Sequence, residues 1–312
     1  MMRAGSILIK TGLWFTMVLS TTIAMNAQQL GQYTHYMSNE LIINPAFAGG
    51  HDALSLTAIH RSQWVGIEGA PTTQSFSIHS LAKNDQMGLG LTLMNDRVGI
   101  HKNFTAQASY AYRLRLDRDS YISFGVQAGV NHKSSDYSAL TVPPQGINDP
   151  TLELIDYANT SMEVGAGVYL KTPKLHLGLS SPKLFSSDTE LNDSVSIALN
   201  NAHYFFYGRY RTPINPNIKL QPNVLIKYLP GLPVSWDAGL NAIWNEVLMT
   251  GISYRSTESI DLLLQAKITP QMKLGYSFDY TLKEVSGLGR SSHEFMLNYI
   301  FEYSNYRTRA PR

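Results

Sequence analysis

Hydrophobic side chains recur at every second position in many segments between about residue 53 and residue 301. One face of residues 121–131 carries only apolar side chains, namely Ile122, Phe124, Val126, Ala128 and Val130. The alternate positions of the same segment hold small or polar residues together with Tyr121. Side chains of a β-strand point alternately to the two faces of its sheet, so this pattern predicts a strand with one apolar and one polar face.

Fourteen segments have this character, and most have a length near the 9–11 residues with which a tilted strand crosses a membrane. They cover residues 53–61, 72–81, 86–95, 103–115, 120–133, 161–170, 174–180, 201–211, 217–228, 234–243, 247–255, 259–268, 271–281 and 292–302. Bacterial outer-membrane barrels have an even number of such strands, with apolar faces toward lipid and polar faces toward the lumen. We therefore predict an all-β fold, a transmembrane antiparallel up-and-down β-barrel of about 14 strands spanning residues 51–303.

The connections between these strands alternate between long and short. The odd-numbered connections include the long ones, at residues 62–71, 134–160, 181–200 and 282–291, whereas the even-numbered ones are mostly tight turns. In bacterial outer-membrane barrels the short turns lie in the periplasm and the long loops outside the cell. A soluble β-sandwich has no reason to sort its loops in this way, so the alternation indicates the cell outer membrane.

The two ends of the chain lie outside the strand pattern. Residues 1–27 are typical of a signal peptide, because Arg3 and Lys10 precede an apolar stretch that ends in small residues. The alternative is a transmembrane anchor, but the polar residues 20–22 interrupt the apolar run short of the ~20 residues that a helical span needs. We expect residues 28–50 to form an N-terminal periplasmic or lumenal segment. Residues 304–312 form a basic tail, either solvated or in contact with an acidic periplasmic partner.

Composition excludes several classes of site. The chain has no Cys, which excludes disulfides, thiolate metal ligands and a thiol nucleophile. Charged residues make up 15% of the chain, against about 25% in soluble domains, and we expect an inner barrel face that is low in charge. The formal charge of +2 comes from Arg3 and Lys10 of the leader, and the neutral remainder does not suit binding to nucleic acid.

Motifs for catalysis and for cofactor binding are absent from the sequence. The nine His residues form no H-x-x-x-H pair, and neither a G-x-S-x-G elbow nor a phosphate-binding loop is present. His79 and His176 alternate within strands and are expected on the lumenal face. We predict that the protein is not an enzyme and that it has no cofactor and no metal site.

Glycines gather on the predicted lumenal face, at Gly88, Gly90, Gly125, Gly129, Gly165, Gly167, Gly178, Gly239 and Gly275. One explanation is that glycine relieves crowding in a strongly curved sheet. The other is that another backbone approaches the inner wall, as when a segment or a partner fills the lumen. Arg113 and Arg115 alternate onto the same face, and we expect them to hold such a segment.

Two motifs near the start of the barrel carry a family resemblance. Residues 44–50 read Asn-Pro-Ala-Phe-Ala-Gly-Gly, and residues 61–72 read Arg-Ser-Gln-Trp-Val-Gly-Ile-Glu-Gly-Ala-Pro-Thr. Together with the matches at 87–90, 95–99 and 110–113, they resemble the PorP/SprF family of outer-membrane proteins of the type IX secretion and gliding machinery. Beyond residue 133 the likeness is one of pattern rather than of motif.

The resemblance implies a non-catalytic outer-membrane barrel with one of two roles. Some members bind secretion-machinery proteins, through a periplasmic ring and a peptidoglycan-linked bridging protein. Others receive the C-terminal signal domain of a large exported adhesin and anchor it at the cell surface. The alternative is a passive porin or a transporter of small hydrophobic molecules. Partners could dock on the outer loops at 134–160, 181–200 and 282–291, or enter the glycine-lined lumen.

The motifs and the inward arginines supply the candidate partner-binding residues, which are Asn44, Pro45, Phe47, Gly49, Arg61, Gln63, Trp64, Gly69, Pro71, Arg113 and Arg115. A structural role is the alternative for residues 44–50, because Asn-Pro and Gly-Gly would turn the chain into the first strand. Trp64 lies in a predicted outer loop, where its side chain either folds back into the lumen or is offered to a partner.

Overall fold

The computed structural model describes residues 31–82, 85–139, 156–189, 195–198, 202–256, 258–282 and 291–301. The predicted signal peptide at 1–27, the basic tail at 304–312 and most of the predicted outer loops 134–160 and 282–291 lie outside these residues. No helix in the described part of the chain has the length and hydropathy of a membrane-spanning helix. The described residues are organised almost entirely as β-strands.

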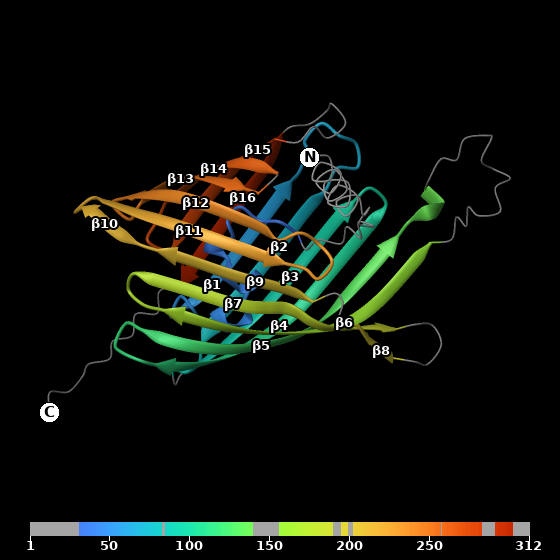
Figure 1. The fold of residues 1–312 in the computed structure, drawn as a ribbon, viewed down its shortest axis with the longest axis horizontal. Helices are drawn as coiled ribbons and strands as arrows, with labels where there is room; N and C mark the ends of the chain where they lie inside the picture. Colours follow the sequence, from blue (N-terminus) through green and yellow to red (C-terminus); the bar gives the residue numbers. More distant parts are fainter. Residues whose placement is uncertain are drawn as a thin grey trace, which may run out of the picture. The chain divides into compact units, whose positions relative to one another are not determined.

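Fourteen of the described strands close into a barrel (Figure 1). They are β1 (Leu54–Ser62), β2 (Thr72–Leu81), β3 (Met87–Val98), β4 (His101–Arg115), β5 (Tyr121–Ser135), β6 (Tyr157–Lys171), β7 (Leu175–Thr189), β9 (His203–Tyr210), β11 (Ile218–Tyr228), β12 (Ser235–Trp244), β13 (Leu248–Arg255), β14 (Ser259–Lys267), β15 (Met272–Thr281) and β16 (Ser291–Phe301). Two short strands, β8 (Val195–Ala198) and β10 (Thr212–Asn215), pair with the ends of β7 and β11.

The barrel closes where its last strand meets its first. β16 pairs antiparallel with β1, with Leu54 opposite Phe301 and Ser62 opposite His293. Every other barrel strand pairs antiparallel with the strands next to it in the chain, and β9 joins β7 to β11. Closure satisfies the backbone groups that an open sheet would expose to lipid. The predicted fourteen-stranded up-and-down barrel is confirmed.

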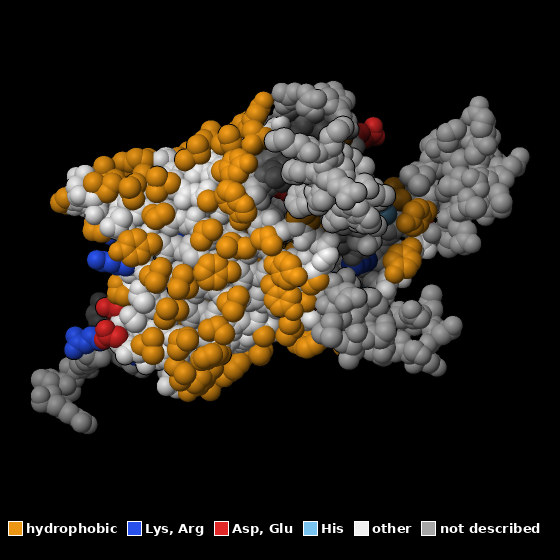
Figure 2. All heavy atoms as spheres, in the orientation of Figure 1, with side chains coloured by type: hydrophobic (Ala, Val, Ile, Leu, Met, Phe, Trp, Pro, Cys, Tyr) orange, Lys and Arg blue, Asp and Glu red, His pale blue; other side chains and the backbone are white. Residues whose placement is uncertain are grey.

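Burial along the strands follows the alternation of the sequence but with polar side chains inside. In β4, Gln107, Ser109 and Arg113 are buried, whereas Tyr110 and Tyr112 between them are exposed. Figure 2 shows hydrophobic side chains spread over the visible strand surface, with the charged side chains toward its ends. An apolar outer surface around a polar interior is the arrangement of a barrel in lipid.

Turn lengths differ between the two ends of the barrel. One end, called the short-turn end, has the connections at residues 116–120, 172–174, 245–247 and 268–271. Asn245 and Glu246 there both have positive φ, at 48° and 57°, and the Val247 N–H donates to the Trp244 carbonyl at 2.9 Å, as in a tight turn between antiparallel strands. The long connections lie at the opposite end, called the long-loop end. The predicted alternation of loop lengths therefore corresponds to two different ends of the barrel.

Residues 181–200 were predicted to form a loop, and this prediction was wrong for most of the segment. β7 continues from the predicted end at residue 180 to Thr189 and pairs there with β8. This extension passes through Pro182, although proline lacks the N–H of a ladder hydrogen bond. The structure instead accommodates it in a bulge, where the register with β6 shifts and the Pro182 carbonyl accepts a hydrogen bond from Gln127 Nε2 at 2.8 Å.

Candidate functional site

A segment that precedes β1 fills the lumen of the barrel (Figure 1). This segment, Tyr33–Gly50, is called the lumenal plug, and all of its residues except Ser38 are buried. It consists mainly of three 3-10 turns, η1 (Tyr36–Ser38), η2 (Glu40–Ile42) and η3 (Pro45–Phe47). The segment predicted as periplasmic or lumenal therefore lies in the lumen over these residues.

The plug is held from several sides of the barrel. Asn39 Nδ2 donates to Ser77 Oγ on β2 at 3.1 Å, and Asn223 Nδ2 on β11 donates to the Tyr36 hydroxyl at 2.8 Å. From β7, the Ser180 hydroxyl donates to the Ile43 carbonyl at 2.6 Å. Turns this short leave many backbone groups without internal partners, so the polar inner wall supplies them.

The Asn-Pro-Ala-Phe motif is both a turn and an anchor. Asn44 Oδ1 accepts from the Ala46 N–H at 2.9 Å and caps η3, while Pro45 occupies the first position of the turn, where no N–H is needed. Asn44 Nδ2 donates to the Val168 carbonyl of β6 at 3.0 Å. Gly49 adopts φ +78°, which an L side chain rarely allows. The motif therefore fixes the plug to the wall and turns the chain toward β1.

Wall glycines make room for this motif. A Cβ on Gly88 would lie 2.0 Å from the Ala48 carbonyl oxygen, and one on Gly125 would lie 2.2 Å from the Ala46 nitrogen. A Cβ on Gly167 would lie 2.1 Å from Asn44 Oδ1. These three glycines on β3, β5 and β6 allow the plug to approach the wall more closely than any side chain would permit.

A buried ion pair holds the middle of the plug. Glu40 is fully buried, and its carboxylate lies 3.0 Å from the Arg209 guanidinium of β9. The Tyr207 hydroxyl donates to the other carboxylate oxygen at 3.0 Å, and Arg209 also donates to the Met37 carbonyl at 3.0 Å. Hydrogen bonds between ionised groups are the stronger ones, so β9 is a principal support of the plug.

A second charged network holds the plug toward the long-loop end. The Glu294 carboxylate of β16 accepts from the backbone N–H groups of Thr34 at 2.9 Å and of His35 at 2.7 Å. Arg61 of β1 lies 3.2 Å from Glu294 and 2.6 Å from Asp279 of β15. All these side chains are almost completely buried, and their charges are paired within the network.

At the short-turn end, the plug leaves the lumen beside two cations. Arg113 donates to the Gly49 carbonyl at 2.8 Å, lies 2.5 Å from Asp52 and covers the Tyr121 ring at 3.8 Å. Lys171 donates to the Gly50 carbonyl at 3.0 Å. The prediction that Arg113 holds a lumenal segment is therefore correct. Arg115 does not do so, because its side chain lies 59% exposed at the rim beside Asp85.

The predicted site residues fall into three places. Asn44, Pro45, Phe47, Gly49 and Arg113 meet where the plug contacts the wall near the short-turn end. Arg61 holds the other end of the plug, and Arg115 lies at the rim. Their partner-binding role stays a prediction, and the contacts of the first group and of Arg61 are made within this chain.

The remaining predicted residues form a hydrogen-bonded outer loop. Gln63 N–H donates to the Pro71 carbonyl at 2.9 Å, which closes the base of the loop. Trp64 N–H donates to Ser292 Oγ of β16 at 3.3 Å, and the Gly69 carbonyl accepts from the Gly99 N–H at 2.8 Å. Neighbouring strands on both sides therefore brace the loop. The Trp64 side chain is half-buried.

Sequence reasoning missed the charged partners of the plug. The expectation of an inner face low in charge was wrong, because Arg209, Asp237, Arg255, Asp261 and Glu294 all point inward. A low overall content of charged residues does not exclude a charged inner face. The lipid-facing positions carry almost no charged residues, so those that are present gather on the inner face. The available signal was a charged residue on the polar face of an otherwise apolar strand, as at Arg209 and Glu294.

The described residues contain no group of three or more His, Cys, Asp or Glu side chains that could hold a metal ion. Their buried polar clusters are instead ion pairs, some between wall strands and others between the wall and the plug. What this arrangement does chemically is bind a peptide segment inside a barrel, through carbonyl, amide and charged groups.

Solved structures of channels and of an outer-membrane protein are similar to this chain. A deletion mutant of the monoaromatic hydrocarbon channel TodX is 12% identical, with a TM-score of 0.50 over 86% of this chain and 95% of the other. The Pseudomonas putida toluene transporter TodX is also 12% identical, with a TM-score of 0.46 over 88% and 95%. Omp33 of Acinetobacter baumannii is 10% identical, with a TM-score of 0.44 over 80% and 99%. At such identities the likeness concerns the fold alone.

No curated protein matches the chain. The model of one protein family, described as type IX secretion system membrane protein PorP/SprF, matches residues 25–299. That match covers the plug and the barrel up to Tyr299, two residues before the end of β16. Membership of this family places the protein in the outer membrane. The chain is therefore a member of the PorP/SprF family and an outer-membrane component of the type IX secretion system.

Proposed function

We propose that this protein is a non-catalytic docking component, which binds proteins of the secretion machinery or anchors an exported adhesin. The observation that supports it most strongly is the lumenal plug. A pore needs an open path, whereas here Tyr33–Gly50 occupy the lumen and pair with its charged wall. Family and fold are those of a structural outer-membrane barrel.

The plug also gives the barrel a stiff interior. An ion pair with β9 and hydrogen bonds with β1 and β16 join the plug to strands around the wall. A docking component benefits from stiffness, because binding surfaces that are already ordered lose less entropy when a partner binds. The surfaces available for docking are the rim at the short-turn end, which faces the periplasm, and the braced outer loop at 63–71.

The test is capture of the tagged full-length protein from its own host after crosslinking in intact cells. Enrichment of periplasmic-ring or peptidoglycan-linked proteins would support the machinery role, and enrichment of one large adhesin through its C-terminal domain would support the anchoring role. An unrelated tagged outer-membrane barrel expressed at the same level serves as control. The proposal fails if neither class is enriched over that control.

The rival function is a passive porin or a transporter of small hydrophobic molecules. A protein with that function should conduct ions or pass solute when purified alone. Solute flux through the intact protein, together with failure to capture secretion proteins, would replace the docking proposal with the transport function.

A further inference from the structure

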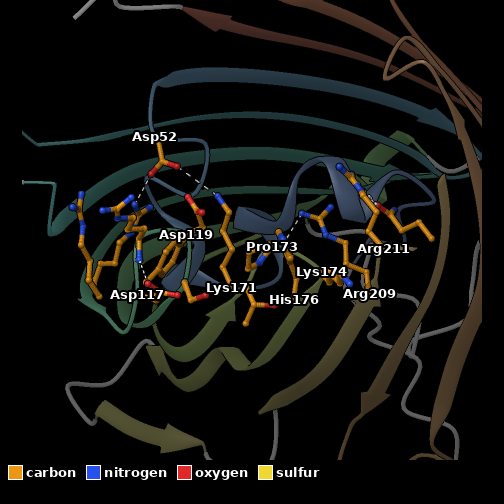
Figure 3. A pocket seen from close by; sticks show the side chains of 16 residues that line it. Asp52, Asp117, Asp119, Lys171, Pro173, Lys174, His176, Arg209 and Arg211 are labelled. Carbon is orange, nitrogen blue, oxygen red and sulfur yellow. Dashed lines mark hydrogen bonds and ion pairs between the residues drawn. The ribbon is translucent and has the colours of Figure 1, made fainter. Parts of the chain in front are cut away.

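A cavity of about 500 Å³ opens at the short-turn end of the barrel, next to the exit of the plug (Figure 3). The ends of β4, β5, β6, β7 and β9 form its walls. Among the described residues, seven arginines and lysines line it and only three aspartates. Two of its lining residues, Arg113 and Lys171, also donate hydrogen bonds to the Gly49 and Gly50 carbonyls of the plug.

Three of the seven cations are paired with Asp52 or with the plug. Arg113 and Lys171 share the Asp52 carboxylate, at 2.5 Å and 3.5 Å, as the dashed lines in Figure 3 show. Arg209 is paired with Glu40 of the plug. One carboxylate, that of Asp52, is therefore shared by two of the cations.

The other four cations keep unused hydrogen-bonding capacity. Arg118 and Lys174 are exposed, and in the described part of the chain neither has an ion-pair partner. Arg115 reaches Asp85 only at 3.4 Å. Arg211 donates to the neutral Gln221 amide oxygen at 3.0 Å and lies 3.8 Å from Glu246.

Glu246 does not relieve this excess of positive charge. A hydrogen bond from Lys219 holds the pKa of Glu246 below its ordinary value, so the carboxylate is ionised at neutral pH, but Lys219 itself balances that charge. Asp117 turns back and accepts from the Arg118 backbone N–H at 2.6 Å. With seven cations and three aspartates among its lining residues, the cavity still carries more positive than negative charge.

We propose that this cavity binds an acidic peptide segment of a periplasmic protein, through its Asp or Glu carboxylates. The inference rests on the proposed docking function and names the site for it. Guanidinium groups pair with carboxylates through two parallel hydrogen bonds, and Arg115, Arg118 and Arg211 supply three such groups. A volume of about 500 Å³ exceeds what a single small anion fills.

The position of the cavity favours a peptide over a lipid headgroup. Its cations lie on inward-facing positions and turns around the lumen mouth, while the outward neighbours of Arg113 are Tyr112 and Leu114 on the lipid face. Short turns of outer-membrane barrels face the periplasm, so the cavity meets soluble periplasmic proteins. Electrostatic steering would also speed their encounter.

The test measures binding of fluorescein-labelled hexaglutamate to the purified full-length protein in a nonionic detergent, by fluorescence anisotropy. We expect salt-dependent binding that weakens at least tenfold when Arg118→Glu and Lys174→Glu are combined. The matched control combines Lys267→Glu with Lys273→Glu, a cross-strand lysine pair at the same end that does not line the cavity. We expect less than a twofold change in that control.

Several outcomes would overturn the inference. Equal weakening of hexaglutamate binding in both double variants would mean that the overall electrostatic field of this end attracts the peptide and that the cavity is not a specific site. Displacement by inorganic phosphate at the concentration at which unlabelled hexaglutamate competes would mean a small-anion site. Loss of peptide binding in phosphatidylglycerol nanodiscs would mean that lipid headgroups occupy the cavity.

Failure of this inference is distinguishable from failure of the docking function. If the wild type and the Arg118→Glu, Lys174→Glu variant capture secretion proteins equally from cells, docking stands and the cavity is not its site. If the wild type captures none, the docking function itself fails, whatever the peptide measurement shows.

Discussion

The carboxylate of Glu294, on the last strand, accepts a hydrogen bond at 2.7 Å from the backbone N–H of His35, near the start of the plug. The two residues are 259 positions apart in sequence. Arg61 of the first strand binds the same carboxylate, so one charged group joins the plug to the seam where the barrel closes. Seating of the plug and closure of the barrel are therefore coupled.

Replacing Glu294 should loosen this junction. The Glu294→Gln variant keeps the shape but removes the charge shared by Arg61 and the plug, although Arg61 retains Asp279 at 2.6 Å. We expect a loss of about 2 kcal/mol in the free energy of unfolding, the usual worth of hydrogen bonds to a charged group. Urea unfolding in detergent measures it, with the exposed Glu68→Gln as control. Equal stability of the two variants would contradict the coupling.

The pair formed by Glu40 and Arg209 should show strong coupling in a double-mutant cycle. Arg209→Met leaves the Glu40 carboxylate buried with only Tyr207, and we expect it to cost about 3 kcal/mol, since Arg209 is 17% exposed. Adding Glu40→Gln removes the buried charge and should restore much of that loss. Simple additivity of the two substitutions, measured by the same unfolding assay, would show that the pair does not hold the plug.

A methyl group on a wall glycine should displace the plug. In Gly125→Ala the new Cβ would meet the Ala46 backbone, and we expect the variant to lose about 1–3 kcal/mol, as for other overpacked interiors. Gly208→Ala is the matched control, because the atom nearest to a Cβ there is the flexible end of the Leu177 side chain, at 3.0 Å. The thermal stability of the two variants is compared by heating each one and observing the shift in gel migration between the folded and the unfolded protein. A larger loss in the control would speak against close packing of the plug.

Engineered cysteines offer a direct map of the plug, because the native chain has none. Asn39 and Ser77 are joined by a side-chain hydrogen bond of 3.1 Å, so Asn39→Cys with Ser77→Cys should form a disulfide under mild oxidation. Asn39→Cys with Leu91→Cys should not, because Leu91 is exposed on the outer face of β3. Gel mobility of the denatured, non-reduced protein reports the crosslink. Crosslinking of the second pair alone would place the plug elsewhere.

Much of the barrel follows from local pattern, because alternation reports directly which face of a strand meets lipid. The wall glycines and Arg113 indicated that something fills the lumen, but the pattern left a partner and a segment of this chain equally open. The plug could not be derived, because its 3-10 turns have no periodicity and its folding depends on wall contacts such as Glu40 with Arg209. Such contacts join residues far apart in sequence, and strand pairing is not visible in one sequence.

The charged lumen shows a second limit. The percentage of charged residues is an average over the whole chain. The barrel places almost no charged residues on its lipid face and most of them in its interior. Glu294 and Arg255 were visible in the sequence as charges on the polar face of their strands, but their ion pairs with Arg61, Asp237 and Asp261 require the register that only the structure supplies.

The measurement that most directly tests a barrel closed by its own N-terminal segment is ion conductance across a planar bilayer. We compare the full-length protein with a variant lacking residues 33–50, and with Glu40→Arg, which keeps the chain length but repels Arg209 from the plug. Circular dichroism confirms that each variant retains its strands. The wild type should show almost no steady conductance, and the plug variants should open clearly above it. A wild type that conducts as well as the plug variants would contradict the account.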